Sequence, residues 1–290
     1  MLVLGAVSCR RADQPVSPDP GKEQPDPGKE QPREHVAFTV QAFGYATKGT
    51  DNSLSEGDAV GLFAAQPVGA VNVKATVSGR TLSPVTAVQW GQNQTEATRF
   101  LSYMPYVADL TGTSLTFSVQ ANQESYAAYA ASDLRLSSEE GVPGKTVHLI
   151  YRHALSKLTV IPVCEDRKEQ VTAVQTGKLT TGVEVNLTDR GLSAKPTQAQ
   201  VKLGKAVVAN GNKGFTAILV PQNGLLPLQL TLDSGRTVDC KLETPATLES
   251  GCAYKAEIRV PAGAKEVSFR LSVTDWLSGG TLPYESTDDD

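Results

Sequence analysis

Cys9 is the residue whose surroundings most clearly predict a chemical modification. An apolar stretch starting at Met1 leads into the small residues Ala6, Val7 and Ser8, and polar, proline-rich sequence follows Cys9. This order is typical of the end of a bacterial lipoprotein signal, in which the cysteine thiol receives the lipid. We therefore expect a mature chain that begins at a lipidated Cys9 and is tethered to a membrane. Because no basic region precedes the apolar stretch, a chance apolar N-terminus is the alternative.

Three further cysteines, Cys164, Cys240 and Cys252, offer thiol chemistry. The segments around Cys240 and Cys252 could be neighbouring antiparallel strands, so a disulfide between them is sterically feasible, although spacing alone does not show it. Three thiols cannot all pair, and we expect Cys164 to be a free, buried thiol. The sequence contains no Cys-x-x-Cys motif or Cys/His cluster, so we expect no metal site.

The remaining polar residues do not form the pattern of a catalytic centre. His148 and His153 are five residues apart, which places them on opposite sides of a strand and favours structural roles. There is no Gly-x-Ser-x-Gly elbow and no phosphate-binding loop. Asp51, Glu56 and Asp58 lack the regular spacing of a calcium loop. We therefore expect no enzymatic activity and no cofactor.

The composition indicates an exported protein rich in strands. With 27 basic and 31 acidic side chains, the net charge of -4 favours no nucleic-acid partner. Valine, threonine, leucine and serine are abundant, and these residues favour strands over helices. No later apolar run approaches the roughly 20 residues that a membrane-spanning helix needs.

The segment 10–34 predicts a spacer. The heptad Pro-Asp-Pro-Gly-Lys-Glu-Gln occurs at 18–24 and again at 25–31. Proline and charge prevent burial and stiffen the chain. We expect this proline-rich linker to hold a folded body away from a lipid surface.

Beyond the linker, apolar and polar residues alternate in short runs bounded by Gly, Asn, Asp and Pro. Such period-two alternation predicts half-buried antiparallel strands, and many of them at regular spacing predict β-sandwiches. The runs include 36–42, 71–77, 115–119, 147–151, 183–187, 226–232, 238–242, 254–260 and 267–273.

The domain division is placed at a polar stretch. The segment Leu134–Lys145 reads as an interdomain connection, because it carries Glu139-Glu140-Gly141 and Pro143-Gly144. We therefore predict an all-β chain of two tandem antiparallel β-sandwich domains, at 35–145 and 146–290, after the signal remnant 1–9 and the linker.

Several different short motifs follow one another in a particular order along most of the chain. They are Phe38-Thr-Val-Gln, Ala46-Thr-Lys48, Glu56-Gly-Asp-Ala-Val-Gly-Leu-Phe63, Trp90, Phe100-Leu-Ser-Tyr-Met-Pro-Tyr106, Tyr151-Arg-His-Ala-Leu-Ser-Lys-Leu158, Gly251-Cys-Ala-Tyr254, and Trp276 followed by Gly279. In this order, and with the lipid signal, the chain resembles the fimbrillin-like proteins of Bacteroidetes, the subunits of type V pili.

The resemblance implies a non-enzymatic pilus subunit made of two transthyretin-like sandwiches. It is exported as an outer-membrane lipoprotein and then joins a cell-surface pilus. In that family a trypsin-like protease cuts after the first strand, and a strand of another subunit fills the groove. The removable strand would here present Val36, Phe38, Val40 and Ala42, and the matching cleavage position is Lys48. The implied partners are other pilus subunits, this protease and the outer membrane through the lipid.

Alternatives stay open for the cleavage position and for the place of the subunit in the pilus. Lys48 stands where the better-known subunits carry arginine, and it could equally be a solvated loop lysine. Arg33 is another basic candidate, but a cut there would release the tether without removing the strand. The segment 277–290 has no alternating apolar run, which favours a tip, adaptor or anchor subunit, unless Val267–Val273 is itself the donor strand.

A second function remains open, that of a surface lipoprotein which binds a glycan or a host protein without polymerising. Exposed aromatic rings could form such a site, although these residues more often cap a sandwich core. The candidates are Tyr103, Tyr106, Tyr126, Tyr129, Trp90 and Trp276.

Overall fold

Strands account for nearly all of the regular structure, as the alternating pattern predicts. The computed structural model describes residues 33–42, 54–208, 213–274 and 276. Within these ranges, the only helix is α1 (Tyr126–Ser132), and all other regular elements are strands. The all-β fold class is confirmed. No helix in the described residues is long and apolar enough to cross a bilayer.

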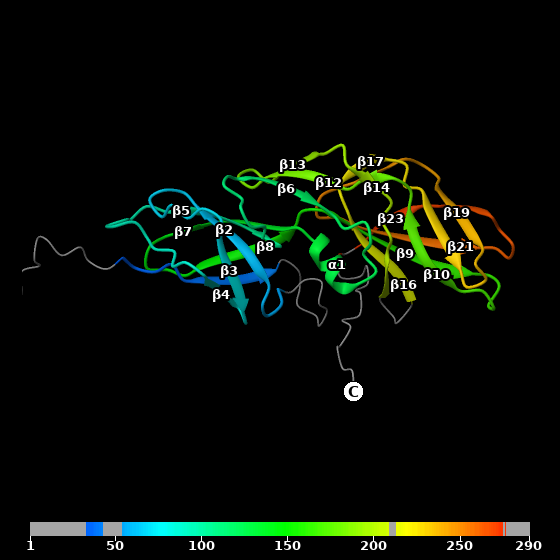
Figure 1. Ribbon diagram of the computed structural model, residues 1–290, viewed down its shortest axis with the longest axis horizontal. Coiled ribbons are helices and arrows are strands. Elements are labelled where there is room, and N and C mark those ends of the chain that lie inside the picture. The colour runs from blue at the N-terminus through cyan, green and yellow to red at the C-terminus, as the bar shows by residue number, and fades with distance from the viewer. Residues whose placement is uncertain (1–32, 43–53, 209–212, 275, 277–290) are drawn as a thin grey trace, which may run out of the picture. The chain divides into compact units, whose positions relative to one another are not determined.

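The first group of strands closes into a barrel (Figure 1). Around the barrel the order is β1 (Phe38–Ala42), β4 (Thr81–Pro84), β3 (Val73–Ser78), β2 (Ala59–Ala64), β5 (Thr98–Met104), β7 (Arg135–Gly141) and β8 (Val147–His153). Strand β1 completes the circle because it pairs with both β8 and β4. Hydrogen bonds between neighbouring strands therefore run all the way around this group.

Strand β7 shows that the prediction of an interdomain connection at Leu134–Lys145 was wrong. The strand pairs with β5 along its whole length, from Arg135 opposite Met104 to Gly141 opposite Thr98. The apolar alternation that marks a strand is weak here because polar side chains, including those of Arg135 and Ser137, are buried.

The second group of strands forms two facing sheets around their own apolar core. One sheet has the order β10 (Val171–Thr176), β18 (Leu228–Leu232), β19 (Thr237–Leu242) and β22 (Glu266–Phe269). The other has the order β15 (Gly204–Val207), β16 (Lys213–Leu219), β9 (Ser156–Cys164), β21 (Ala253–Val260) and β23 (Leu271–Thr274). The runs predicted as strands at 226–232 and 238–242 form a hairpin, since β18 and β19 pair across a turn in which Gly235 has φ +81°.

A third sheet joins strands from both halves of the sequence. Strand β6 (Ser114–Ser118) pairs with β12 (Gly182–Asn186), which pairs in turn with β13 (Gly191–Ala194). Two short ladders complete the structure: β11 (Leu179–Thr180) with β14 (Gln198–Ala199), and β17 (Gln222–Gly224) with β20 (Ala246–Leu248). The barrel also contains β8, which follows residue 145 in the sequence. Strand pairing therefore crosses position 145/146, and the domain division predicted there stays a proposal.

The run 267–273, predicted as one strand, is two strands in different sheets. Strand β22 runs parallel to β19, whereas β23 runs antiparallel to β21. The chain crosses between the sheets at Arg270, whose exposed side chain pairs with Glu243. Apolar residues keep their period of two through the crossing, which is why the sequence does not reveal it.

Replacing Ile258 with alanine should destabilise the second group of strands. Ile258 lies on β21 and is fully buried in the core. We expect a loss of about 2–5 kcal/mol in the free energy of unfolding, measured by denaturant titration, because the substitution leaves a cavity. Val273→Ala on the neighbouring strand β23 is the control. Val273 is exposed, so its truncation should change stability by less than about 0.5 kcal/mol. Equal losses in the two variants would contradict the assigned core.

Candidate functional site

The backbone of strand β1 is hydrogen-bonded on both sides. From Phe38 to Ala42 the strand lies parallel to β8, with Phe38 opposite Val147 and Ala42 opposite Tyr151. On its other side the amide of Val40 donates to the carbonyl of Arg80 at 2.9 Å. The residues before the strand continue this contact, since the amide of Val36 donates to the carbonyl of Val88 at 2.9 Å. Segment 34–42 therefore fills the space between β8 and the β4 side of the barrel.

The side chains of β1 divide between the barrel core and its surface. Val36, Phe38 and Val40 are buried in the barrel core. The ring of Phe38 meets that of Phe100 edge to face, with centroids 5.4 Å apart. Burial of such side chains contributes about 1.5–3 kcal/mol each. The strand is thus anchored by alternate apolar residues.

The surface side of β1 makes one specific polar contact with β8. Thr39 Oγ1 and His148 Nδ1 are 2.6 Å apart across the parallel ladder. Ala37 and Gln41 are exposed. Alternation of buried and exposed residues is what a strand with one face on a core requires.

Loss of β1 would uncover both backbone and apolar surface. The main-chain groups of β8 from Val147 to Tyr151 would lose their ladder partner. Phe100 would lose the ring of Phe38, although it would keep an edge-to-face contact with Trp90 at 5.5 Å between centroids. Unpaired backbone and exposed apolar surface both favour the addition of another strand.

The residues predicted for the removable strand belong to β1 and to the residues just before it. Val36, Phe38 and Val40 face the barrel core, and the backbone of Ala42 ends the ladder with β8. The side chain of Ala42 and the residues Cys9 and Lys48 lie outside the described part of the chain. The structure therefore locates the strand, while its removal stays a proposal.

The cysteines correct the reasoning that placed Cys240 and Cys252 on neighbouring strands. Cys240 lies on β19, whose neighbours are β18 and β22, whereas Cys252 immediately precedes β21 in the other sheet. Both are free thiols, as is Cys164, which is only partly buried. Burial raises the pKa of the Cys240 thiol to about 12. The disulfide that the sequence allowed is not formed.

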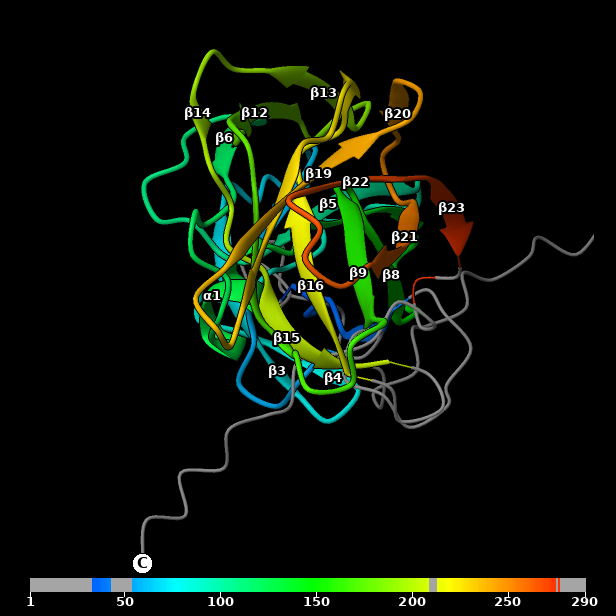
Figure 2. The ribbon, with the colours of Figure 1, turned by 90° about the vertical axis from the view of Figure 1, so that its right-hand side faces the viewer.

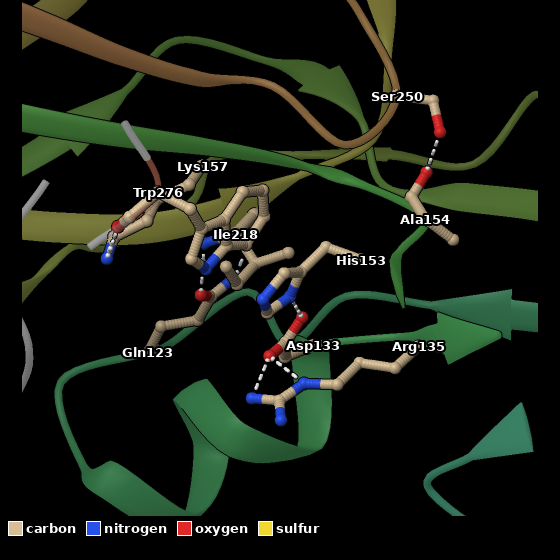
Figure 3. A network of polar contacts seen from close by, with 9 residues as sticks. All are labelled: Gln123, Asp133, Arg135, His153, Ala154, Lys157, Ile218, Ser250 and Trp276. Carbon is tan, nitrogen blue, oxygen red and sulfur yellow. Dashed lines mark hydrogen bonds and ion pairs between the residues drawn. The ribbon is translucent and has the colours of Figure 1, made fainter. Parts of the chain in front are cut away.

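A buried polar network lies where strands β7 and β8 meet (Figure 3). Asp133, just before β7, accepts a hydrogen bond from Arg135 Nε at 2.8 Å through Oδ2. Its other carboxylate oxygen lies 2.7 Å from Nδ1 of His153, the last residue of β8. All three side chains are at most 7% exposed.

Opposite charges determine the state of Asp133. Burial alone would raise the pKa of its carboxyl group, but the charges of Arg135 and His153 and their hydrogen bonds outweigh burial. The pKa of Asp133 therefore lies well below its usual range. A carboxylate that is ionised at neutral pH thus holds the two strand ends together.

Trp276 extends this network to the segment after β23. Its ring stacks on the imidazole of His153, with centroids 3.8 Å apart. The fully buried Lys157 donates from Nζ to the carbonyl oxygen of Trp276 at 3.0 Å. Trp276 thus contacts the end of β8 and the start of β9, although it follows both by more than 100 positions in the sequence.

Gln123 is a second polar tie in the same region. Its Nε2 donates to the carbonyl of Ile218 at 2.8 Å, and its Oε1 accepts from the amide of Ile218 at 2.8 Å. The side chain is fully buried. It joins the loop before α1 to strand β16.

Sequence reasoning missed most of this network. The sequence favours a structural role for His153, but it does not reveal the partners Asp133 and Trp276, which are 20 and more than 100 residues away. The only local signal is the pair of opposite charges at Asp133 and Arg135.

The other candidate residues have structural surroundings. Tyr103, Tyr129 and Trp90 are buried, as expected for aromatic residues that complete a core. Glu56 and Asp58 accept hydrogen bonds from nearby backbone amides. Among the described residues there is no group of three or more side chains that could hold a metal ion.

Comparison with known proteins identifies relatives of this architecture. The model of the fimbrillin-like family matches residues 47–276, so β1 precedes the first matched residue. A candidate cell adhesion protein of Bacteroides uniformis has a similar structure, with a TM-score of 0.65 and 17% identity, covering 83% of this chain and 98% of that chain.

A second candidate cell adhesion protein, from Bacteroides ovatus, gives a TM-score of 0.68 at 13% identity. The likeness covers 87% of this chain and 100% of that chain. No curated protein matches. These structural likenesses concern the fold.

Asp133→Asn should destabilise the protein and flatten its response to acid. The substitution leaves Arg135 and His153 buried without their carboxylate, and we expect a loss of about 3–5 kcal/mol. Because the pKa of Asp133 is lower in the folded state, its contribution is present above the unfolded value near about 4. The contribution is lost as the pH falls below that value. Unfolding titrations at a series of pH values between neutral and acidic should therefore show a shallower acid dependence in the variant.

Glu139→Gln is the matched control for Asp133→Asn. Glu139 lies on β7, the strand that follows Asp133, but its ion pair with Arg152, at 3.5 Å, is partly exposed. Its loss should change the free energy of unfolding by less than about 1 kcal/mol. An acid response in Asp133→Asn as steep as that of the unmodified chain would contradict the role given to Asp133.

Proposed function

Because this chain belongs to the fimbrillin-like family, we propose that it is a structural, non-enzymatic subunit of a cell-surface fimbria. Assembly proceeds by strand exchange: β1 leaves after proteolysis, and a strand of another subunit takes its place. Cys9 carries the lipid that holds the precursor at the outer membrane before assembly.

The observation that carries this proposal is the position of β1. It is the first described strand of the chain, and it closes the barrel between two strands that otherwise do not pair with each other. Its removal would leave the order from β4 to β8 intact, because the other ladders do not involve β1. A barrel opened in this way keeps most of its core and gains a slot with unpaired edges.

The slot defines what a donor strand must supply. Main-chain groups must match β8 in parallel, in the register of Phe38 opposite Val147. Apolar side chains must occupy the core positions of Val36, Phe38 and Val40, and the residue at the position of Thr39 must point outward. Backbone pairing supplies affinity, and the alternate side chains supply register.

Lys48 is the proposed cleavage position of a trypsin-like protease. It follows β1 by six residues in the sequence, so a cut there would separate the strand from the rest of the barrel. The same cut would free the barrel from the linker and from Cys9. Release from the membrane and opening of the slot would then be a single event.

Cleavage at Lys48 should be followed by association. We expect limited digestion of the full chain with a trypsin-like protease to give a new N-terminus at Gly49, because Lys48 would be the P1 residue. Oligomers should then appear by size-exclusion chromatography. Sequencing of the new N-terminus measures the first step.

Lys48→Gln tests the position, and Lys145→Gln is its control, since Lys145 is an exposed lysine elsewhere. Lys48→Gln should prevent both cleavage and oligomers, whereas Lys145→Gln should prevent neither. A monomer that resists cleavage at Lys48 would instead support the second function, a surface lipoprotein that binds glycan or host protein without polymerising.

A peptide of residues 33–42 should restore the opened barrel. Added to the cleaved chain, it should bind and raise the thermal midpoint of unfolding, because it returns the buried side chains and the ladder of β1. The same peptide with Phe38→Asp should fail, since a carboxylate would be buried in the core. With Ala37→Asp, at an exposed position, the peptide should still bind. Equal binding by the two substituted peptides would disprove the assigned register.

A further inference from the structure

A groove lies at one end of the second group of strands, and no residue of β1 lines it. Its cavity volume is about 690 Å³, which is within the usual range of ligand sites. Its walls come from the end of β9, the start of β10, strand β15 and the start of β16. Figure 2 shows β15, β16 and β9 as neighbours in one sheet.

In the groove wall, the ladder between two neighbouring strands ends before one of the strands does. The ladder between β9 and β16 ends at Val160 opposite Phe215. Strand β9 nevertheless continues to Cys164 along its other neighbour, β21. Pro162 lies in this continuing part and has no amide to donate. The end of β9 therefore has no strand partner on the β16 side among the described residues.

Strand edges, as well as side-chain faces, line the groove. Lys205, Ala206 and Val207 of β15 all contribute to it, as do Gln170, Val171 and Thr172 at the start of β10. Successive side chains of a strand point to opposite faces, so consecutive lining residues indicate that the backbone edge faces the cavity. Both β15 and β10 are end strands of their sheets. An extended segment could pair with such an edge.

The charged residues around the groove are mainly basic. Arg167, Lys205 and Lys213 line it and are exposed. Among the described residues that line the groove, the one carboxylate, Glu169, is paired with Arg236, with Oε2 and Nη2 2.5 Å apart. The groove is thus locally positive in a chain whose formal net charge is -4.

Exposed apolar residues accompany this positive charge. Val207 is 53% exposed on the groove wall, and the partly exposed Pro162 also lines the groove. Large apolar side chains exposed beside an open strand edge mark a surface suited to a partner.

We propose that this groove binds an extended acidic peptide segment of a partner protein. The segment adds to the open strand edge, its carboxylates meet Arg167, Lys205 and Lys213, and its apolar residues cover Val207 and Pro162. An anionic sugar fits less well, because Phe215, the only aromatic residue in the described part of the groove lining, is buried and offers no face for stacking. The proposal does not depend on the removal of β1.

Binding can be measured with a fluorescent peptide in which Glu alternates with Val. Added to the full chain carrying Cys9→Ser, it should raise the fluorescence anisotropy, and binding should weaken as salt is added. Lys205→Glu with Lys213→Glu should weaken binding at least about tenfold, because both reverse charges that face the ligand. Lys145→Glu, an exposed lysine in the barrel, should leave it unchanged.

Cys164 gives a second readout that reports position. It lines the groove, whereas Cys252 is also partly buried and does not. The bound peptide should slow alkylation of Cys164 and leave alkylation of Cys252 unchanged. This readout stays available even if the charge-reversal variant folds poorly.

Four results would overturn the proposal. They are no binding at about 1 mM peptide, equal binding by a peptide in which Lys alternates with Val, stronger protection of Cys164 by a sulfated oligosaccharide, and protection only by a peptide of residues 277–290. The last two would assign the groove to a glycan or to the chain's own acidic segment.

Discussion

Closure of the barrel by β1 is the constraint on which the rest of the first group of strands depends. The strand is parallel to β8 and antiparallel to β4, so it satisfies two backbone edges that would otherwise be open. Its buried side chains complete an aromatic cluster with Phe100 and Trp90. One short segment therefore decides whether the barrel is a closed surface or a sheet with two exposed edges.

The polar network around Asp133 also holds strands together, at the C-terminal end of β8. Its charges and the stacked rings of His153 and Trp276 connect β7, β8 and the residues after β23. Buried ion pairs add little stability compared with well-packed apolar residues, but breaking one is strongly destabilising. Such a network favours one arrangement of the strand ends over alternatives, which suits a junction between groups of strands.

The sequence predicted the all-β class and several strands, because alternation is local and survives wherever one face is buried. It failed at β7, where polar residues occupy the barrel wall, and at Arg270, where the chain changes sheets without breaking the alternation. The parallel pairings of β1 with β8 and of β9 with β21 could not be predicted from the sequence either, since they join residues about 100 positions apart. For the candidate site, the alternating residues of β1 were visible, whereas its two neighbours were not.

The parallel pairing of β1 with β8 also fixes the direction in which a strand can occupy the site. Parallel and antiparallel ladders place their hydrogen bonds differently, so a segment entering backwards would mismatch both walls. A contact made by one end of a molecule with a dissimilar surface of the next is heterologous. Repeated contacts of that kind do not form a two-fold dimer; unless they close into a ring, they continue head to tail as a polar filament.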